Sequence, residues 1–154
     1  MSTFNLPYGR GTIKADLPKH RICGILESRL HLVQPGKRQE DLICEALMHP
    51  VDSPRLSQLA KDKHKVVIIA SDHTRPVPSK LIIPAMLAEI RQGNPRADIT
   101  ILIATGCHRG TSKKELVYKF GEDIVRDEKI LIHDCTRKED MADLGVLPQA
   151  EGCS

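Results

Sequence analysis

Three short apolar runs, rich in β-branched residues, recur in the second half of the chain and predict buried strands. They cover residues 65–70, 99–104 and 129–133. Helical patterns of apolar positions lie between them, over 79–91 and 112–120. Strands that alternate with helices in this way indicate consecutive βαβ units with right-handed crossovers, and therefore a parallel sheet. The continuous apolar run of the first strand is typical of a strand covered on both faces.

Weaker patterns precede these strands. Gly9-Arg10-Gly11 is a turn signal, and alternating apolar and polar residues over 12–17 predict a short strand, with a second short strand over 21–26. An apolar stripe predicts a helix over 38–48. The pair Ser53-Pro54, an N-cap followed by proline at the first helical position, predicts another helix start.

Capping signals delimit the helices between the strands. Ser79 follows two prolines and is the expected N-cap of the first helix, which Gly93-Asn94-Pro95 ends. Ser112 and Glu115 have the spacing of a capping box at the start of the second helix, and Gly121 is its expected C-terminal cap.

Together these elements predict one α/β domain over residues 1–154. We expect a small doubly wound, mainly parallel sheet of Rossmann-like type, with short β segments at the N-terminus. Only three clear strands are present and the pattern fades after Asp134, so we expect this domain to be a fragment of a longer two-domain protein.

Composition narrows the function classes. The net charge is +3, and 23 Lys and Arg are interleaved with 20 acidic residues, which disfavours the contiguous positive face that non-specific nucleic-acid binding needs. Five cysteines form no C-x-x-C pair, and no secretory leader pattern opens the chain, which favours a reduced, cytoplasmic protein. No apolar run approaches the ~20 residues of a membrane helix, so we expect neither a membrane nor a nucleic-acid partner.

Two polar segments begin where predicted strands end. Residues 71–76 (Ser-Asp-His-Thr-Arg-Pro) follow the first strand, and residues 104–109 (Ala-Thr-Gly-Cys-His-Arg) follow the second. In open α/β sheets, ligands bind beyond the carboxyl ends of such strands. Asp72, Arg75 and His108 are therefore expected to share one pocket. They offer a carboxylate, a guanidinium suited to an anion, and an imidazole suited to proton transfer.

Each of these residues also has a purely structural interpretation. Asp72 can accept a hydrogen bond from the Thr74 N–H in a turn. Arg75 can rest on the surface, and His108 can be a loop residue without a task. No ligand set with zinc-like spacing and no glycine-rich phosphate-loop signature occurs in the sequence. The residues alone therefore predict a site for a small anion with one acid–base group, and residues 133–135 could line the same edge.

Four segments carry a resemblance to a known family. They are residues 71–79 (Ser-Asp-His-Thr-Arg-Pro-Val-Pro-Ser), 104–109, 6–9 (Leu-Pro-Tyr-Gly) and 119–125 (Lys-Phe-Gly-Glu-Asp-Ile-Val). Together they resemble the amino-terminal domain of the nickel-dependent lactate racemase family, and the resemblance covers nearly the whole chain.

The resemblance implies a specific chemistry. Enzymes of this family interconvert the stereoisomers of 2-hydroxy acids with a nickel pincer nucleotide, the nickel complex of pyridinium-3,5-bisthiocarboxylic acid mononucleotide. The α-hydrogen of the substrate moves as hydride to this cofactor while a histidine takes the hydroxyl proton. By resemblance, His108 and Arg75 are catalytic residues, and Arg75 lies near the substrate carboxylate. The cofactor contacts that the resemblance implies are Asp72, His73, Thr74 and Arg75.

Parts of the family's machinery cannot be assigned to this chain. They are the second acid–base histidine, the lysine that tethers the cofactor and the histidine that ligates nickel, so we expect no metal ligand here. The family commonly has an aromatic residue at the position of Cys107 and proline at that of Gly110, so the substrate could differ from lactate. We expect no turnover by the 154-residue chain alone, no retained cofactor, and the C-terminal portion of the same enzyme as its partner.

Two other functions fit the residues. A non-catalytic α/β module would bind a small anionic ligand or a nucleotide through Arg75 and would not need His108. An assembly domain would present the pocket at the strand ends to a protein partner. Ligand binding that is lost with Arg75→Ala but unchanged with His108→Ala would favour the binding module.

Overall fold

The structure, a computed structural model, describes residues 1–143 and 145. The chain divides into two units, Met1–Gly36 and Lys37–Ser154. Within the described residues, no helix is long and apolar enough to cross a membrane.

The first unit is a β-hairpin followed by an irregular segment. Strands β1 (Ser2–Tyr8) and β2 (Gly11–Leu17) pair antiparallel, which confirms the predicted N-terminal β segments. Gly9 makes the turn at φ +58°, a left-handed conformation that glycine adopts without steric cost. The second strand predicted after β2, over 21–26, is wrong, because these residues pair with no strand. Two 3-10 turns follow the hairpin, at Lys19–Arg21 and Leu30–Leu32.

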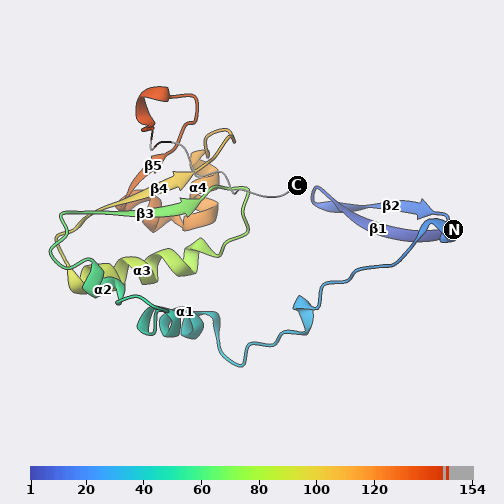
Figure 1. Cartoon of the computed structure of the whole chain (residues 1–154), viewed down its shortest axis with the longest axis horizontal. Coiled ribbons are helices and arrows are strands. Elements are labelled where there is room, and N and C mark those ends of the chain that lie inside the picture. The colour runs from blue at the N-terminus through green and yellow to red at the C-terminus, as the bar shows by residue number, and fades with distance from the viewer. Residues whose placement is uncertain (144, 146–154) are drawn as a thin grey trace. The chain divides into compact units, whose positions relative to one another are not determined.

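The second unit is built on a three-stranded parallel sheet (Figure 1). Its strands, side by side in chain order, are β3 (Lys65–Ser71), β4 (Asp98–Ala104) and β5 (Lys129–Ile132). Helix α3 (Ser79–Gly93) connects β3 to β4, and helices α4 (Lys113–Phe120) and α5 (Glu122–Asp127) connect β4 to β5. The predicted α/β class, with a parallel sheet and N-terminal β segments, is therefore confirmed.

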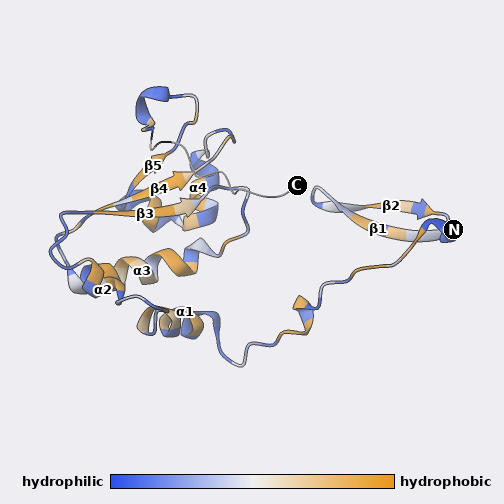
Figure 2. Ribbon diagram, in the orientation of Figure 1, coloured by the Kyte–Doolittle hydropathy of each residue, from blue (hydrophilic) through white to orange (hydrophobic). Residues whose placement is uncertain are grey.

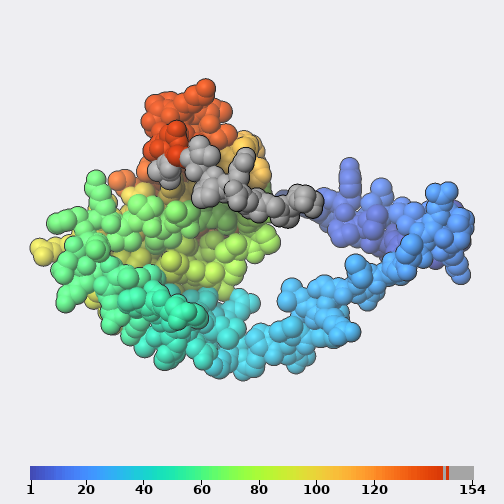
Figure 3. Space-filling model, in the orientation of Figure 1, coloured from blue at the N-terminus to red at the C-terminus, as the bar shows by residue number. Residues whose placement is uncertain are grey.

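Two helices precede the sheet and lie against α3. They are α1 (Gln39–Met48), which was predicted, and the short α2 (Leu56–Leu59). A 3-10 turn at Lys138–Asp140 follows β5. In the space-filling view, side chains fill the space between helices and sheet, so this unit forms one continuous body (Figure 3).

Helix α4 begins where its capping signal predicted, whereas helix α2 does not. Ser112 caps α4: its hydroxyl accepts from the Glu115 N–H, and the Glu115 carboxylate accepts from the Ser112 N–H at 2.8 Å. The start predicted at Ser53-Pro54 is wrong, because α2 begins at Leu56 with Arg55 as its N-cap.

Helix α3 begins one position earlier than its capping signal predicted. Pro78 is the N-cap, Ser79 is the first helical residue, and no side chain caps this end of the helix. At the other end, Gly93 closes the helix beside the backbone of α2. A Cβ atom at Gly93 would overlap the carbonyl oxygen of Ser57, so this position requires glycine.

One face of the sheet forms the core. The register places Ile68 opposite Ile101 and Ala70 opposite Ile103, and all four are at most 8% exposed. The helices contribute Ile83, Leu87, Ile90, Leu116 and Phe120 to the same cluster. Figure 2 shows β3 and β4 as largely hydrophobic, whereas hydrophobic and hydrophilic segments alternate along α3. Burial of this one cluster holds the unit together.

The opposite face of the sheet is open. Val67 is 58% exposed, Ile69 is 72% exposed and Leu131 is 51% exposed. The prediction that the first strand is covered on both faces is therefore wrong for the described residues. The reason lies in the topology, because right-handed crossovers between strands in chain order place their helices on the same face. Accordingly, α3 contacts α4.

Candidate functional site

The carboxyl ends of β3 and β4 bring a carboxylate and an imidazole together. Asp72 follows β3 and is only 2% exposed. His108 lies in the turn after β4, and its Nδ1 is 2.6 Å from Asp72 Oδ2. The two residues are 36 positions apart in the sequence, so the parallel pairing of the strands creates this contact.

The turn that carries His108 depends on one glycine. Gly106 has φ +57°, the left-handed region that other residues rarely adopt. The His108 N–H then donates to the Thr105 carbonyl at 3.0 Å, which closes a tight turn at the end of the strand. The sequence Thr105-Gly106-Cys107-His108 thus returns the imidazole over the end of β3.

The second carboxylate oxygen of Asp72 holds the loop that follows β3. Asp72 Oδ1 accepts from the Thr74 N–H at 3.1 Å and from the Thr74 hydroxyl at 2.7 Å. Asp72 therefore holds the turn through one carboxylate oxygen and contacts His108 through the other. The hydrogen bonds from Thr74 and His108 hold the pKa of Asp72 well below its usual range.

The charge of Asp72 determines which nitrogen of His108 carries the proton. An ionised carboxylate only accepts hydrogen bonds, so Nδ1 of His108 must be the donor. In the neutral ring, Nε2 then has a free lone pair. The His108 side chain is 47% exposed, which leaves this nitrogen accessible to a ligand.

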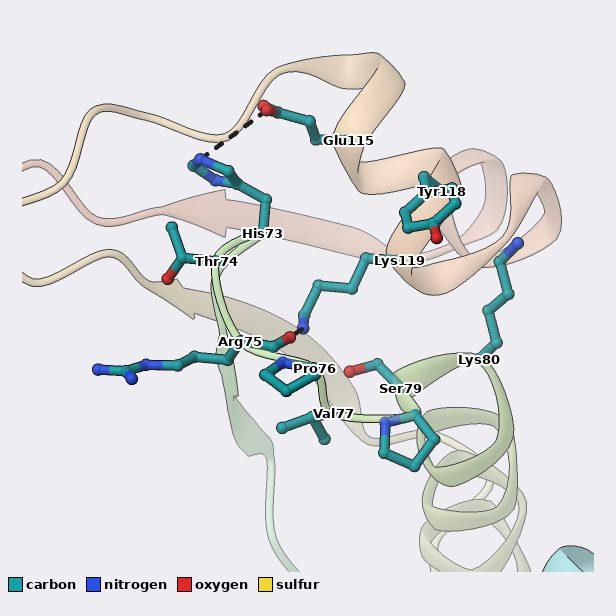
Figure 4. A pocket seen from close by; sticks show the side chains of 11 residues that line it. His73, Thr74, Arg75, Pro76, Val77, Ser79, Lys80, Glu115, Tyr118 and Lys119 are labelled. Atoms are coloured by element: carbon teal, nitrogen blue, oxygen red, sulfur yellow. Dashed lines mark hydrogen bonds and ion pairs between the residues drawn. The ribbon is translucent and has the colours of Figure 1, made fainter. Parts of the chain in front are cut away.

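Arg75 completes the group of three residues that the sequence places at this edge. Asp72, Arg75 and His108 all line one depression of about 460 Å³ at the ends of the two strands. Arg75 is exposed, and its guanidinium forms no ion pair within the described residues. Its side chain extends away from α4 (Figure 4). The depression therefore presents one cation and one proton acceptor.

His73 points to the other side of the loop, toward α4 (Figure 4). Its Nδ1 lies 3.2 Å from Thr111 Oγ1, and its Nε2 lies 3.8 Å from Glu115 Oε1. The loop thus presents two surfaces, one with Arg75 beside His108 and the other with His73 beside α4.

Arg109 points away from the depression. It forms a bidentate pair with Glu115, with N–O distances of 2.9 and 2.6 Å. The pKa of Glu115 lies well below its usual range, chiefly because of Arg109 and then of Ser112. Glu115 is therefore already neutralised by a neighbour.

Hydrogen bonds join the residues that directly follow β4 and β5. The Thr105 hydroxyl donates to the His133 carbonyl at 2.7 Å, and its oxygen lies 3.1 Å from His133 Nδ1. Because the hydroxyl hydrogen is already used, His133 Nδ1 must be the donor to Thr105. Residues 133–135 line a depression that borders His108 without including Asp72 or Arg75.

Lys119 is a buried polar residue for which the sequence pattern predicted no role in the site. It is 8% exposed, and its ammonium donates to the Arg75 carbonyl at 2.8 Å. Burial lowers the pKa of Lys119, and the charge of Asp72 opposes this shift. Its spacing from Leu116 and Phe120 was an available signal, because the three share the buried face of α4.

The described residues supply donors for an organic anion but no metal centre. Over residues 1–143 and 145, no three His, Cys, Asp or Glu side chains converge closely enough to hold a metal ion. The exposed Arg75 guanidinium and the His73 ring suit a carboxylate or nucleotide. The residues thus fit the organic part of the cofactor that the resemblance implies and do not fit its nickel.

Comparison with known proteins gives consistent matches. Residues 8–154 match the family described as lactate racemase N-terminal domain. Two curated relatives are lactate racemases: that of Thermoanaerobacterium thermosaccharolyticum is 45% identical over 96% of the chain, and that of Lactiplantibacillus plantarum is 40% identical over 99%. The chain spans about a third of their lengths, 35% and 36%. The solved apoprotein structure of the T. thermosaccharolyticum enzyme matches with a TM-score of 0.78 at 45% identity, over 96% of this chain and 34% of that one.

Proposed function

The chain belongs to the lactate racemase N-terminal domain family, and from that premise we propose that it contributes half of a 2-hydroxy acid racemase site. In this proposal, the depression at the ends of β3 and β4 binds the carboxylate of the substrate and moves the proton of its hydroxyl group. The observation that carries the proposal is the contact of the buried Asp72 with His108 beside the free guanidinium of Arg75.

Arg75 binds the substrate carboxylate. Its planar guanidinium can donate two parallel hydrogen bonds to a carboxylate, a geometry that a lysine ammonium does not offer. No acid of the described residues competes for it, so the charge is available to a ligand. A carboxylate bound there places the neighbouring hydroxyl of a 2-hydroxy acid within the same depression as His108.

His108 takes the hydroxyl proton at Nε2 and returns it in the reverse direction. The proton on Nδ1 stays with the hydrogen bond to Asp72, so the ring becomes an imidazolium paired with a carboxylate. Asp72 holds the ring in the productive orientation and stabilises its charge, as the carboxylate does in carboxylate–histidine pairs of hydrolases. Asp72 is thus a positioning residue in this proposal.

The nickel pincer nucleotide, when bound, supplies the acceptor for the α-hydrogen as hydride. His73, Thr74 and Arg75 are the residues that would contact it, since all three belong to the loop after β3 and line a pocket beside that loop. The resemblance also implies a contact with Asp72, whose two oxygens here bond to Thr74 and His108. The nickel ligand and the tethering lysine would come from a C-terminal portion of a longer enzyme.

A chimera tests the proposed activity. The chain is joined to the remaining two thirds of the T. thermosaccharolyticum relative, loaded with cofactor, and assayed for lactate racemisation. We expect activity that His108→Ala lowers by roughly 10²–10⁴-fold, the usual contribution of general acid–base catalysis. His64→Ala is the matched control, because His64 is exposed at the opposite end of β3. Full activity of the His108→Ala chimera would overturn the role of His108.

Asp72→Asn separates positioning from simple structural support. The amide has only one acceptor oxygen, so it cannot accept hydrogen bonds from both Thr74 and His108. We therefore expect kcat to fall, while KM for lactate, which Arg75 determines in this proposal, stays within about twofold. ¹⁵N spectra of the His108 ring should also show loss of the Nδ1–H tautomer preference. An unchanged tautomer with unchanged kcat would remove Asp72 from the mechanism.

Titration of the 154-residue chain with L-lactate tests substrate binding without the cofactor. At constant ionic strength, the Arg75 guanidinium and His108 ring signals should shift together, and Arg75→Ala should abolish the shift. Arg96→Ala, an exposed arginine at the other end of the sheet, is the matched control. Binding that ignores Arg75 would contradict the proposed carboxylate site.

A further inference from the structure

One buried residue anchors the turn that carries His108. Along residues 104–110, Thr105 alone is buried, at 1% exposed, and the others are exposed. Gly106, the next residue, has φ +57° and no side chain, so it restricts the backbone of the turn only weakly. The position of His108 therefore depends on what holds Thr105.

Thr105 is held by His133, the residue that follows β5. The Thr105 hydroxyl donates to the His133 carbonyl at 2.7 Å, and its oxygen accepts from His133 Nδ1 at 3.1 Å. The His133 N–H donates to the Ile103 carbonyl at 3.0 Å. Backbone and side chain together thus extend the hydrogen-bonded ladder between β4 and β5 beyond the ends of both strands.

The Thr105 carbonyl transmits this restraint to His108. It accepts from the His108 N–H at 3.0 Å, so the residue that β5 holds by its side chain also closes the turn. Asp72, which follows β3, holds the His108 ring through Nδ1 at 2.6 Å. The His108 side chain is 47% exposed, so packing adds little to these two restraints. Its backbone is thus held through β5 and its ring through β3.

We propose that Thr105 and His133 are positioning residues, which hold the His108 turn so that Nδ1 stays within hydrogen-bonding distance of Asp72. Thr105 also lines the depression, but its hydroxyl already donates and accepts, so its effect on a ligand passes through His108. The effect on turnover rests on the proposed acid–base role of His108, whereas the effect on the geometry of the ring does not. A displacement of a reacting group by about 1 Å can lower a rate by about 10²-fold, so such a restraint matters for catalysis.

Nuclear magnetic resonance of the 154-residue chain tests the contacts without cofactor or substrate. At a pH where both rings are neutral, we expect His108 and His133 to carry their proton on Nδ1. We also expect the Thr105 hydroxyl proton to exchange slowly with water, because it is buried and hydrogen-bonded. A neutral His133 ring with its proton on Nε2 would overturn the proposal, because Nδ1 could then not donate to Thr105.

Thr105→Val and Thr105→Ser separate the hydroxyl from the shape of the side chain. Valine keeps the size and the β-branching but cannot hydrogen-bond, so the Nδ1 proton of His108 should exchange with water about tenfold faster. Serine keeps the hydroxyl and should restore the slow exchange. Thr136→Val is the matched control, because the Thr136 hydroxyl also bonds to a neighbour, Asp134, but in an exposed turn. Equal exchange rates in Thr105→Val and Thr136→Val would refute the positioning role.

His133→Phe covers the case in which Thr105→Val does not fold. Phenylalanine occupies the space of the ring and leaves the backbone carbonyl of this position in place, so only the Nδ1 contact is lost. We expect the His108 Nδ1 proton to exchange several times faster than in the parent chain. His49→Phe, at an exposed histidine that follows α1, is the matched control. The same exchange rate in both variants would contradict the role of His133.

The chimera with the T. thermosaccharolyticum relative gives the catalytic readout. Thr105→Val should lower kcat by about tenfold or more and leave KM for lactate within about twofold, because Arg75 stays in place. Thr105→Ser should recover most of kcat. If His108→Ala inactivates the chimera while Thr105→Val leaves kcat unchanged, the positioning role is refuted and the proposed function stands. If His108→Ala leaves the chimera active, the proposed function falls, and the exchange rates of the His108 proton still decide the positioning role.

Discussion

The two faces of the parallel sheet use the same residue types in opposite environments. Ile68 and Ile69 are neighbours in β3, yet the first is 5% exposed and the second is 72% exposed. On β4, Ile101 lies in the same row as Ile68 and is fully buried. A strand that is apolar on both sides therefore does not show how many layers cover it. That number follows from the topology of the helices.

The functional groups lie beside the core, at the edge that the two faces of the sheet share. The depression with Asp72 and His108 includes Ala70 from the covered face and Ile69 from the open face. The site thus lies at the strand ends, where the two faces meet, and not within the core. Substitutions on the covered face should therefore affect stability, and those at the strand ends should affect binding.

The largest effect is expected on the covered face. Ile101→Ala should lower the free energy of unfolding by about 2–5 kcal/mol, because it leaves a cavity in a fully packed cluster. Urea unfolding followed by circular dichroism measures this change. A loss below ~1 kcal/mol would mean that the covered face is not the stabilising one.

A second large effect is expected where the helix layer is tightest. Gly93→Ala places a Cβ atom against the Ser57 carbonyl, so α2 and α3 must separate. Overpacking of this kind costs about 1–3 kcal/mol. Gly36→Ala is the matched control, since a Cβ there meets nothing within 4 Å. Equal unfolding midpoints for the two variants would contradict the close approach of the helices.

The fold was predictable where periodicity alone decides it. The three strands and the capping box of Ser112 with Glu115 follow from local patterns, and both are confirmed. The predicted cover of both faces failed because apolar residues indicate only that a surface suits burial. The N-cap expected at Ser79 failed because Pro78 takes that position and has no side-chain acceptor.

The site was predictable to the extent that it follows from topology. The rule that ligands bind at the ends of parallel strands brought Asp72 and His108 together across 36 residues. Their roles in catalysis stay predictions. Lys119 was missed because a lysine is rarely buried, whereas this one lies on the buried face of α4 beside Phe120.

The pH dependence of the free energy of unfolding tests the contribution of the buried Asp72 carboxylate. The pKa of Asp72 is lowered by its hydrogen bonds, so the unfolded chain takes up a proton at higher pH than the folded chain. Its stabilising contribution is full above the unfolded pKa of about 4 and is lost as the pH falls below it. Between pH 5 and 2, the free energy of unfolding of Asp72→Asn should therefore depend less steeply on pH than that of the parent. Parallel slopes would show that the Asp72 hydrogen bonds do not stabilise the fold.

A smaller effect on stability is expected for the exposed arginine of the depression. Arg75→Ala should change the free energy of unfolding by less than ~1 kcal/mol, since its side chain is exposed and unpaired in the described residues. The same variant should lose the lactate-induced shifts of the His108 ring. A large drop in thermal stability would instead make Arg75 a structural residue and would weaken the proposed site.

The smallest effect is expected on the open face, and it bears most directly on the contrast between the faces. Ile69→Thr keeps a β-branched side chain, so the strand propensity is retained while apolar surface is lost. Because Ile69 is 72% exposed, little burial energy is at stake, and the free energy of unfolding of the chain should change by less than ~0.5 kcal/mol. The matched change on the other face, Ile68→Thr, places a hydroxyl in the core and should be far more costly. If Ile69→Thr proved as destabilising as Ile68→Thr in urea unfolding, the outer row would be buried in solution, and the sheet would have two covered faces.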